Sequence, residues 1–503
     1  MKPWAIPAAV AVVFTAAPFI NIGRPFLRHR EVVGAVYASM ARNHVRLGYA
    51  QTRLASYEVS APDLSVYPNW KSTCYPNRTF LSVLITSVWI RVFGDGEAVV
   101  RLSLLVAALG ALAAFVALAR KLLDPRWVGT AAALFALNPM FWYFSIVAVH
   151  LTYALTFSLA AWACRVRWEE HRRWRILTFV FLFLACESDW PGFYAALSMA
   201  IDAFLERKRP LAAAFFSVGI AVFGLHLLHL RAIDPAGGGA LVRRFFAAGA
   251  ERSAEGLPNP VAFVFGEVRE LGLYFTGGLL LLAAVGVRTL PRRVWLLALL
   301  GLDEVLFMRW AHVHDYLTYP LVPFFALAGA RGVELLWTTP PRKLAAGALL
   351  ALAAAQSLWI TGSRLTREGA YEVNYLAARA IREGTGERDR VLITIADERQ
   401  FTPYYADRYT AGVEPGEPNL MVHPSGERFP AAAVEDLERY FGDYSVVLVG
   451  DPERAASEIK FFKGQRPPPE FRFLEPSHPL RTKLEATARS KETRGAFVLY
   501  RLR

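Results

Sequence analysis

Five ionisable residues that lie beside apolar segments are the ones in this sequence that could do chemistry at a membrane. They are Glu31, Glu187, Asp189, His314 and Asp315. An ionisable side chain beside a hydrocarbon core costs free energy, so it is usually kept for a function. The pattern of basic residues described below places all five on the same, non-cytoplasmic side. This shared side indicates an enzyme that works at the outer face of a membrane.

Glu31 ends the sequence Arg28-His29-Arg30-Glu31 at the start of a helical pattern. It fits two interpretations. One is an acid in the first turn of a helix, favoured by the helix dipole. The other is a general base held among cations at the membrane surface. The segment around it is rich in cations, which suits either an anionic lipid phosphate or ordinary headgroup contact: Arg24, Arg28, Arg30, Arg42, Arg46, Arg53, Lys71 and Arg78.

Glu187 and Asp189 lie in the sequence Glu187-Ser188-Asp189-Trp190-Pro191-Gly192, at the junction of two predicted helices. Asp189 could cap the second helix, since Asp is a preferred N-cap residue and Pro is tolerated in the first turn. The two acids could instead hold a divalent cation through oxygen ligands. Two carboxylates without a third ligand specify no metal, so a divalent cation stays an alternative to the capping interpretation.

His314 and Asp315 begin another apolar run and form a His-Asp pair. The pair is either structural or a contact for a phosphate or an acceptor at the mouth of the bundle. Asp303 and Glu304 differ from it, because they lie within an apolar run, where an ionisable group is read as functional by default. They favour a different function, described last in this section.

Apolar length predicts how the chain is built around these residues. A helix needs roughly 20 apolar residues to span a bilayer core. We predict a polytopic α-helical membrane protein with about eleven transmembrane helices. The apolar runs are Trp4–Ile20, Ala98–Ala119, Trp127–Val147, Leu151–Cys164, Ile176–Cys186, Trp190–Leu205, Leu211–Leu230, Leu271–Val287, Val294–Trp310, Tyr316–Gly332 and Leu344–Ile360.

Basic residues cluster in alternate short loops, which is typical of cytoplasmic loops. The clusters are Arg120 to Arg126, Arg165 to Arg175, Arg207 to Arg209, Arg288 to Arg293 and Arg342 to Lys343. The hairpins around His150, Asp189 and His314 hold no Lys or Arg. We therefore predict a multi-pass protein of the plasma (inner) membrane, with a cytoplasmic N-terminus and an extracytoplasmic region after Arg364.

The composition agrees with a membrane protein. The chain has 503 residues, of which 54% are hydrophobic and only 20% charged. Much of its net charge of +13 belongs to the cytoplasmic loops, so we do not expect nucleic-acid binding. Of the three cysteines only Cys74 falls in a predicted outer loop, so no structural disulfide is expected.

Two domains are predicted. Residues 1–363 form the transmembrane domain, with a large first outer loop at 22–79 that holds a helix from Glu31 to Leu47. The apolar stretch Phe80–Phe93 is too short to span and is predicted to be an interfacial or re-entrant helix. Residues 364–503 form a small soluble extracytoplasmic α/β domain. Its predicted helices are Tyr371–Arg382, Ala431–Phe441 and Pro452–Phe462, and its predicted strands are Arg390–Ile395, Tyr444–Gly450 and Ala496–Leu502.

Four stretches resemble one known family in their order and shared side. They are Glu31 to Tyr37 with Ala41-Arg42-Asn43-His44, Val92-Phe93-Gly94 with Glu97 and Arg101-Leu102, Ser188 to Gly192, and His314-Asp315-Tyr316 with Pro320-Leu321. The layout resembles the membrane glycosyltransferases of the C superfamily. That group contains the protein O-mannosyltransferases and the bacterial aminoarabinose transferase (glycosyltransferase family 39-like), which have an acidic residue near the start of a large first outer loop.

The sequence departs from that family at two places. Family members commonly have Asp or Asp-Glu where this chain has the single acid Glu31. They commonly have His-Pro-Pro or Lys-Pro-Pro where it has Arg78-Thr79-Phe80.

The resemblance implies transfer of a sugar from a polyprenyl-phosphate donor to a lipid, glycan or protein at the outer face. Glu31 would be the general base, and Arg30, Lys71 and Arg78 would bind the donor phosphate. Three residues would shape the site: Asp189, His314 and Asp315. Membrane lipids are further expected partners.

Two alternatives stay open. The first is a secondary transporter or lipid flippase that uses Asp303 and Glu304. Such proteins usually show inverted repeats and broken helices, and we predict neither here. The second is an inactive membrane anchor that presents the C-terminal domain, which the two departures from the family favour.

Overall fold

The chain folds into two compact units. A computed structural model describes residues 5–20, 22–57, 74–233, 239–254, 260–306, 314–367, 369, 371–396, 401–413, 420–422, 428–430 and 441–502. The first unit, the helical unit, comprises Met1–Arg24, Pro76–Ile85 and Ala98–Thr366. The second, the mixed unit, comprises Pro25–Tyr75, Thr86–Glu97 and Arg367–Arg503. Most of the predicted first outer loop thus shares a unit with the C-terminal region.

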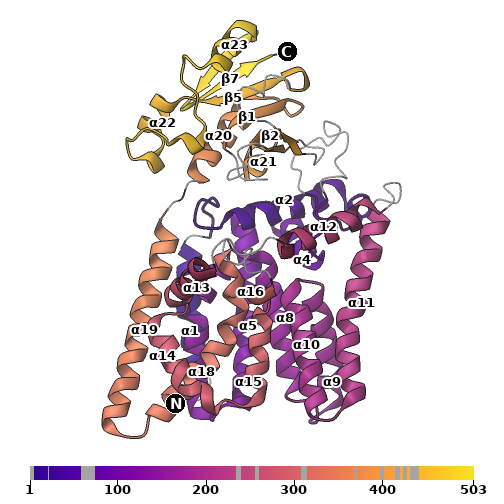
Figure 1. Cartoon of the computed structure of the whole chain (residues 1–503), viewed down its shortest axis with the longest axis vertical. Helices are drawn as coiled ribbons and strands as arrows, with labels where there is room; N and C mark the ends of the chain where they lie inside the picture. The colour runs from indigo at the N-terminus through magenta and orange to yellow at the C-terminus, as the bar shows by residue number, and fades with distance from the viewer. Residues whose placement is uncertain are drawn as a thin grey trace. The chain divides into compact units, whose positions relative to one another are not determined.

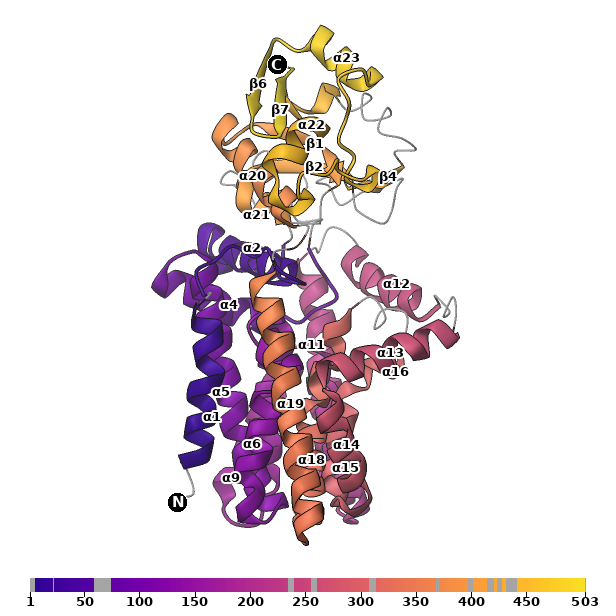
Figure 2. The same ribbon diagram turned by 90° about the vertical axis from the view of Figure 1, so that its left-hand side faces the viewer.

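Long helices that lie side by side make up the helical unit. In Figure 1, α8, α9, α10 and α11 run alongside one another. In Figure 2, α14, α18 and α19 do the same. The described helices are α1 (Ala5–Ile20), α5 (Glu97–Leu122), α6 (Val128–Ala136), α7 (Pro139–Phe144), α8 (Val149–Arg165), α9 (Arg172–Cys186), α10 (Trp190–Leu205), α11 (Arg209–Ile233), α12 (Ala240–Ala254), α13 (Pro260–Tyr274), α14 (Gly277–Gly286), α15 (Arg292–Leu297), α16 (Asp303–Leu306), α18 (Val322–Leu336) and α19 (Pro340–Thr366), with the short 3-10 helices η5 (Ala298–Gly301) and η6 (Asp315–Leu321).

Several apolar runs are broken helices, contrary to our expectation. The run Trp127–Val147 divides into α6 and α7, and Asn138 caps α7 by accepting the Met140 N–H. α13 and α14 meet at an angle of 98°. The run from Val294 passes through α15, η5 and α16. Because broken helices are present, their expected absence is no longer an argument against the transporter alternative.

Only some of the predicted crossings pass a strict test of length and apolar composition. Among the described residues, α5, α11 and the helix that begins at Pro340 pass it. A fourth is counted if the bent pair α13 and α14 forms one span. α1 and α4 (Leu81–Phe93) are apolar but shorter, and α4 lies where we predicted a non-spanning helix. The total of about eleven crossings stays a prediction.

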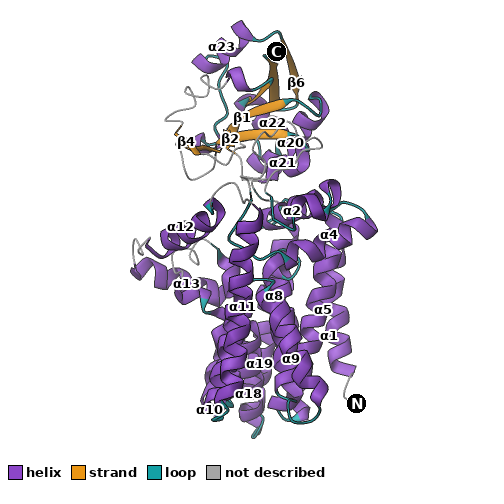
Figure 3. Ribbon diagram, turned by 90° about the vertical axis from the view of Figure 1, so that its right-hand side faces the viewer, coloured by secondary structure: helices purple, strands orange, loops and turns teal. Residues whose placement is uncertain are grey.

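The mixed unit contains a seven-stranded sheet in the order β4-β3-β2-β1-β5-β7-β6 (Figure 3). β1 is parallel to both of its neighbours, and the other pairings are antiparallel. The strands are β1 (Arg390–Ala396), β2 (Tyr409–Val413), β3 (Leu420–Val422), β4 (Arg428–Pro430), β5 (Val446–Gly450), β6 (Ser490–Arg494) and β7 (Phe497–Arg501). The helices are α2 (Val32–Leu47), α3 (Tyr49–Thr52), α20 (Tyr371–Gly384), α21 (Phe401–Ala406), α22 (Pro452–Glu458) and α23 (Pro479–Thr487), with η8 (Lys460–Phe462) and η9 (Pro469–Phe471).

The core of this unit lies between the sheet and α20. Val391 and Ile393 of β1 and Leu448 of β5 pack in one cluster with Val373 and Ile381 of α20. Every residue of β5 is buried, as expected for a strand covered on both faces.

A small C-terminal α/β fold is therefore confirmed. The predicted helix Tyr371–Arg382 and the three predicted strands match α20, β1, β5 and β7. The predicted helix Pro452–Phe462 is α22 followed by η8. The predicted helix Ala431–Phe441 falls, apart from Phe441, outside the described residues.

Candidate functional site

A tight hairpin between α9 and α10 carries Asp189. At Gly192 the two helices approach so closely that a Cβ would lie 2.1 Å from the backbone carbonyl carbon of Ala185, so only glycine fits. The first residues of α4 dock on this hairpin. The Leu81 N–H donates to the Glu187 carbonyl at 3.2 Å, and the Ser82 hydroxyl donates to the Ser188 carbonyl at 3.1 Å. These bonds bring Arg78 to the hairpin.

Asp189 forms a buried ion pair with Arg78. The Arg78 Nη1 donates to Asp189 Oδ1, and the two side chains are only 8% and 1% exposed. His150, at the start of α8, places its Nε2 3.6 Å from Asp189 Oδ2. Asp189 occupies the N-cap position of α10, but its side chain makes no capping hydrogen bond. The capping interpretation of its carboxylate is therefore wrong.

His314 and Asp315 lie in the same polar cluster. The Tyr274 hydroxyl donates to Asp315 Oδ2 at 2.6 Å, and Arg364 Nη2 donates to the Tyr274 oxygen at 2.7 Å. The Tyr316 ring packs edge-on against both His150 and His314, at centroid distances of 6.1 and 5.5 Å. The structure thus brings together the three residues that we predicted to shape the site.

Asp303 belongs to this cluster as well. Tyr194, on α10, donates its hydroxyl to Asp303 Oδ1 at 2.5 Å. The same Tyr194 lies within electrostatic range of Asp189 and Arg78. Asp303 therefore adjoins the candidate site, while the side chain of Glu304 falls outside the described residues.

Four residues of the cluster were not predicted from the sequence: His150, Tyr194, Tyr274 and Arg364. His150 carried a signal, because it lies in a predicted outward hairpin without Lys or Arg. The chain has 19 tyrosines, so Tyr194 and Tyr274 stand out only once their acidic partners are known.

Glu31, in the mixed unit, has a different setting. It stands at the N-cap position of α2, its carboxylate does not cap the helix, and it is 1% exposed. The Arg28 backbone N–H donates to Glu31 Oε2 at 2.9 Å, and Arg28 Nη1 lies 3.6 Å from Oε1. The Arg28 turn therefore fixes the direction of the carboxylate. Arg30 adopts a φ of 60° in the same turn, and Lys71 falls outside the described residues.

The residues around Asp189 do not fit a divalent cation. The guanidinium of Arg78 already supplies positive charge at Asp189 Oδ1, and His150 lies beside Oδ2. Burial raises the pKa of Glu187 to about 7, which disfavours the ionised form that binds metals. Among the described residues, no three His, Cys, Asp or Glu side chains group as metal ligands. We derive no step that uses a metal.

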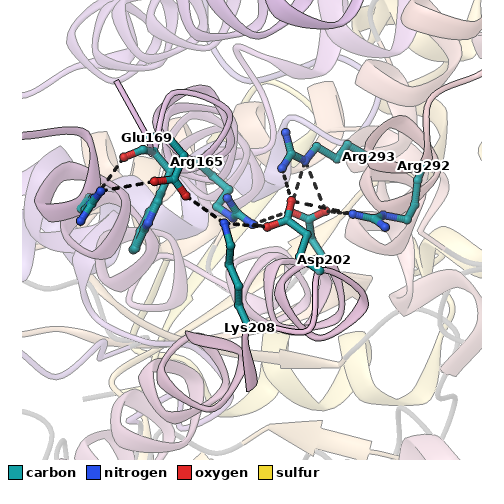
Figure 4. A network of polar contacts seen from close by, with 9 residues as sticks. Arg165, Glu169, Asp202, Lys208, Arg292 and Arg293 are labelled. Atoms are coloured by element: carbon teal, nitrogen blue, oxygen red, sulfur yellow. Dashed lines mark hydrogen bonds and ion pairs between the residues drawn. The ribbon is translucent and has the colours of Figure 1, made fainter. Parts of the chain in front are cut away.

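The other end of α10 carries a cluster of arginines (Figure 4). Asp202, with its side chain fully buried, pairs with Arg165 at 2.8 Å, Arg292 at 3.1 Å and Arg293 at 3.2 Å. Burial would raise the pKa of Glu206, but hydrogen bonds and charge from Arg165 and Arg293 lower it to about 2. Residues from three predicted cytoplasmic loops thus meet at one end of the helical unit, and the acid and histidine cluster lies at the other end of the same helix.

A surface hollow of about 600 Å³ lies at this arginine end rather than at the acids, lined in part by Trp168, Glu170 and His171. Three of its charged groups are already paired, Arg175 and Glu169 with each other and Glu170 with Lys121. Nothing in its lining suggests chemistry.

The fold of the chain is that of known membrane glycosyltransferases. ArnT from Cupriavidus metallidurans superposes with a TM-score of 0.58 at 12% identity, over 98% of this chain and 97% of that chain. A second ArnT structure, bound to undecaprenyl phosphate, gives a TM-score of 0.57. The oligosaccharyltransferase of Archaeoglobus fulgidus, tethered to an acceptor peptide, gives 0.59 at 14% identity, over 92% of this chain and 70% of that chain.

The resemblance predicted from the four sequence stretches is confirmed as a structural one, and the fold is that of multi-pass membrane proteins. By sequence, no protein-family model and no curated protein matches the chain.

Proposed function

We propose that this chain is a membrane glycosyltransferase of hexosyl- or pentosyltransferase type. It would move a sugar from a polyprenyl-phosphate-linked donor to an acceptor at the extracytoplasmic face. The observation that carries the proposal is the fold shared with ArnT over nearly the whole of both chains. One ArnT structure holds undecaprenyl phosphate, and one oligosaccharyltransferase structure holds dolichol-phosphate and an inhibitory peptide. A polyprenyl-phosphate carrier and a separate acceptor are therefore the substrate classes that the fold supports best.

The reaction requires few catalytic groups. An acceptor oxygen or nitrogen bonds to the anomeric carbon of the sugar, and the bond from that carbon to the phosphate oxygen breaks. Phosphate leaves as a stable anion, so no acid has to protonate it, in contrast to the hydrolysis of a glycoside. A base must take the proton from the acceptor, and cations must stabilise the departing phosphate.

Glu31 is the proposed base. Its two oxygens face the backbone N–H and the guanidinium of Arg28, which hold the carboxylate in one direction. A general base has to be aimed within hydrogen-bond reach of the proton that it removes. Among the acidic residues of the predicted first outer loop that the structure describes, Glu31 is the one whose carboxylate is held in one direction.

Arg78 is a proposed ligand of the donor phosphate, together with Arg30 and Lys71. The ion pair with Asp189 fixes the orientation of the Arg78 guanidinium, which carries five N–H donors in a planar fork. Asp189, His314 and Asp315 would then shape the site around the donor. Asp189 does so by holding Arg78, and Asp315 by holding the Tyr274 hydroxyl.

The extracytoplasmic face is part of the proposal. Its support is the gathering of residues from three basic loops at one end of α10, since such loops favour the cytoplasm. A reporter fused after Arg364 should be active only outside the cytoplasm. Activity on the cytoplasmic side would reverse the assignment of the faces.

The function is tested by measuring sugar transfer from a set of polyprenyl-phosphate sugars to membrane extracts. Glu31→Gln keeps the shape of the side chain and removes its charge, so turnover should fall by roughly 10²–10⁴-fold while donor binding survives. Glu372→Gln is a matched control, because Glu372 is also a buried acid near the start of a helix and accepts a backbone N–H, that of Phe461, at 2.8 Å. The control should transfer sugar at the normal rate.

Three outcomes would count against the proposal. Full activity of Glu31→Gln would remove Glu31 from the mechanism. A folded wild-type protein that transfers no sugar from any donor would favour the inactive anchor. Movement of a lipid or solute without sugar transfer, lost in Asp303→Asn, would favour the transporter.

A further inference from the structure

The segment that carries Glu31 is bonded to the C-terminal part of the mixed unit just before its turn. The Phe26 N–H donates to the Tyr405 hydroxyl at 2.7 Å, and the Gly369 N–H donates to the Leu27 carbonyl at 2.8 Å. The Phe26 ring is 1% exposed and fits against Gly34 of α2, where a Cβ would lie 2.8 Å from it. Two consecutive residues directly before the Arg28–Glu31 turn are thus fixed by residues more than 340 positions later in the chain.

The far end of α2 is held by the same region. Arg42 Nη1 donates to the Tyr404 carbonyl at 2.8 Å, and the Arg42 guanidinium lies 4.1 Å from the centre of the Tyr404 ring. Arg46 makes two hydrogen bonds to the carboxylate of Asp407, at 2.5 and 2.9 Å. A planar fork that meets both oxygens of a carboxylate is the geometry that gives an Arg pair both strength and direction.

Asp407, which binds Arg46, lies in a turn directly after α21. It follows α21 with a φ of 52°, and its N–H donates to the Pro403 carbonyl at 2.9 Å. Burial would raise the pKa of Asp407, but the hydrogen bonds and charge of Arg46, with the charge of Arg42, lower it. The Asp407 carboxylate is therefore ionised at neutral pH, and its contact with Arg46 of α2 is an ion pair.

We propose that Tyr405 and Asp407 are positioning residues, through which the C-terminal domain aims the Glu31 carboxylate for the transfer step. This inference rests on the proposed function, in which Glu31 is the base. The physical reason is that a base works only when it is within hydrogen-bond reach of its proton, and a displacement of about 1 Å can cost on the order of 10²-fold in rate. A segment of an outer loop reaches that precision when packed elements hold it at both ends.

Two variants test the two attachments. Tyr405→Phe keeps the ring and removes the hydroxyl that accepts the Phe26 N–H, and Asp407→Asn removes the charge that Arg46 meets. Both should lower kcat by roughly 10- to 100-fold, with the KM for the donor changed by less than about twofold. Asp451→Asn is the matched control. It weakens an Asp–Arg pair of the same domain that is more buried than Arg46–Asp407, with Asp451 3.0 Å from Arg481, and should leave kcat unchanged.

A double-mutant cycle separates positioning from a general structural effect. If Tyr405 and Asp407 act only by aiming Glu31, then Tyr405→Phe and Asp407→Asn should cause no further loss in the residual activity of Glu31→Gln. If they lower that residual rate by the same factor as in the wild-type background, they act elsewhere, and the inference is overturned.

Hydrogen exchange gives a readout that does not need activity. The Phe26 amide should exchange faster in Tyr405→Phe, while the amide of Val391 in β1 should not change. Suppose that the Phe26 amide exchanges faster in Tyr405→Phe but Glu31→Gln keeps full activity. The bond from Tyr405 would then hold the segment before Glu31, while Glu31 would not be the base. Unchanged exchange and unchanged kcat in both variants would overturn the inference itself.

Discussion

Arg78 and Asp189, which are 111 positions apart in the sequence, form an ion pair with 8% and 1% of their side chains exposed. Removing two charges from water costs several kcal/mol per ion, and attraction repays this only when other polar groups complete the setting. His150 is one such group, 3.6 Å from Asp189. A pair this costly is better explained by the need to hold Arg78 in one orientation than by stability.

Breaking this pair should destabilise the protein. Asp189→Asn leaves the Arg78 guanidinium buried without its counter-charge, so the free energy of unfolding should fall by about 3–5 kcal/mol. Thermal unfolding of the purified protein in detergent measures this. In the double variant Asp189→Asn with Arg78→Gln the loss should be smaller than the sum of the single losses, because no lone charge remains. Additive losses would show that the two side chains do not depend on each other.

The arginine cluster at the other end of α10 should affect stability without affecting catalysis. Asp202→Asn removes the buried carboxylate that meets Arg165, Arg292 and Arg293, and should cost about 3–5 kcal/mol in the free energy of unfolding. Any protein that remains folded should keep its KM for the donor. Glu169→Gln removes an exposed acid that pairs with Lys208 at 2.8 Å, and should have a much smaller effect. A large change in KM for Asp202→Asn would connect this cluster to the substrate site.

Glu187 should make stability depend on pH. Burial raises its pKa from 4.5 to about 7 in the folded protein. Between these two values the folded state holds a proton that the unfolded state has lost. The free energy of unfolding should therefore fall as the pH rises from about 4.5 to about 7, and this contribution should level off above that range.

Thermal unfolding at a series of pH values, for the wild-type protein and for Glu187→Gln, tests this dependence. Gln cannot ionise, so the variant should lose the part of the pH dependence that lies in this window. It should also be the more stable of the two at pH 8. Identical pH profiles would show that folding does not raise the pKa of Glu187.

The sequence predicted helix boundaries well where local signals mark them. The predicted run Trp190–Leu205 coincides with α10, and Pro191 in its first turn marks the helix start. The bend before α14 was missed, since the run Leu271–Val287 is apolar on both sides of it and periodicity does not show a break. A local signal did exist there, because Thr276 caps α14 by accepting the Leu279 N–H.

In the small α/β domain, too, some strands were predicted from local signals and others were missed. β1 and β5 were predicted because runs of β-branched residues favour buried strands. β6 was missed, because Ser490–Arg494 is polar and mostly exposed, as edge strands often are. The acids of the candidate site were predicted from their residue type, because an acidic side chain near a membrane costs free energy. Arg78 was also predicted, but its pairing with Asp189, and the contacts that His150 and Tyr274 make with the acids, are set by tertiary packing, which no local pattern contains.

The Tyr274 hydroxyl links Asp315 to Arg364 and should contribute to both stability and transfer. Tyr274→Phe keeps the ring and removes the hydrogen bonds of 2.6 and 2.7 Å, each to a charged group. Such bonds contribute about 1.5–3 kcal/mol each, so unfolding should become easier by roughly that amount or more. Because Asp315 would lose the group that orients it, sugar transfer should fall as well.

Tyr153→Phe provides the comparison, because its buried hydroxyl donates at 3.0 Å to the neutral Ser103 hydroxyl. A neutral bond contributes about 0.5–1.5 kcal/mol, so this variant should be less destabilised. Its transfer rate should also stay near that of the wild-type protein. Equal losses of stability and of transfer in both variants would show that Tyr274 acts only through packing, and would remove Asp315 from the residues that shape the site.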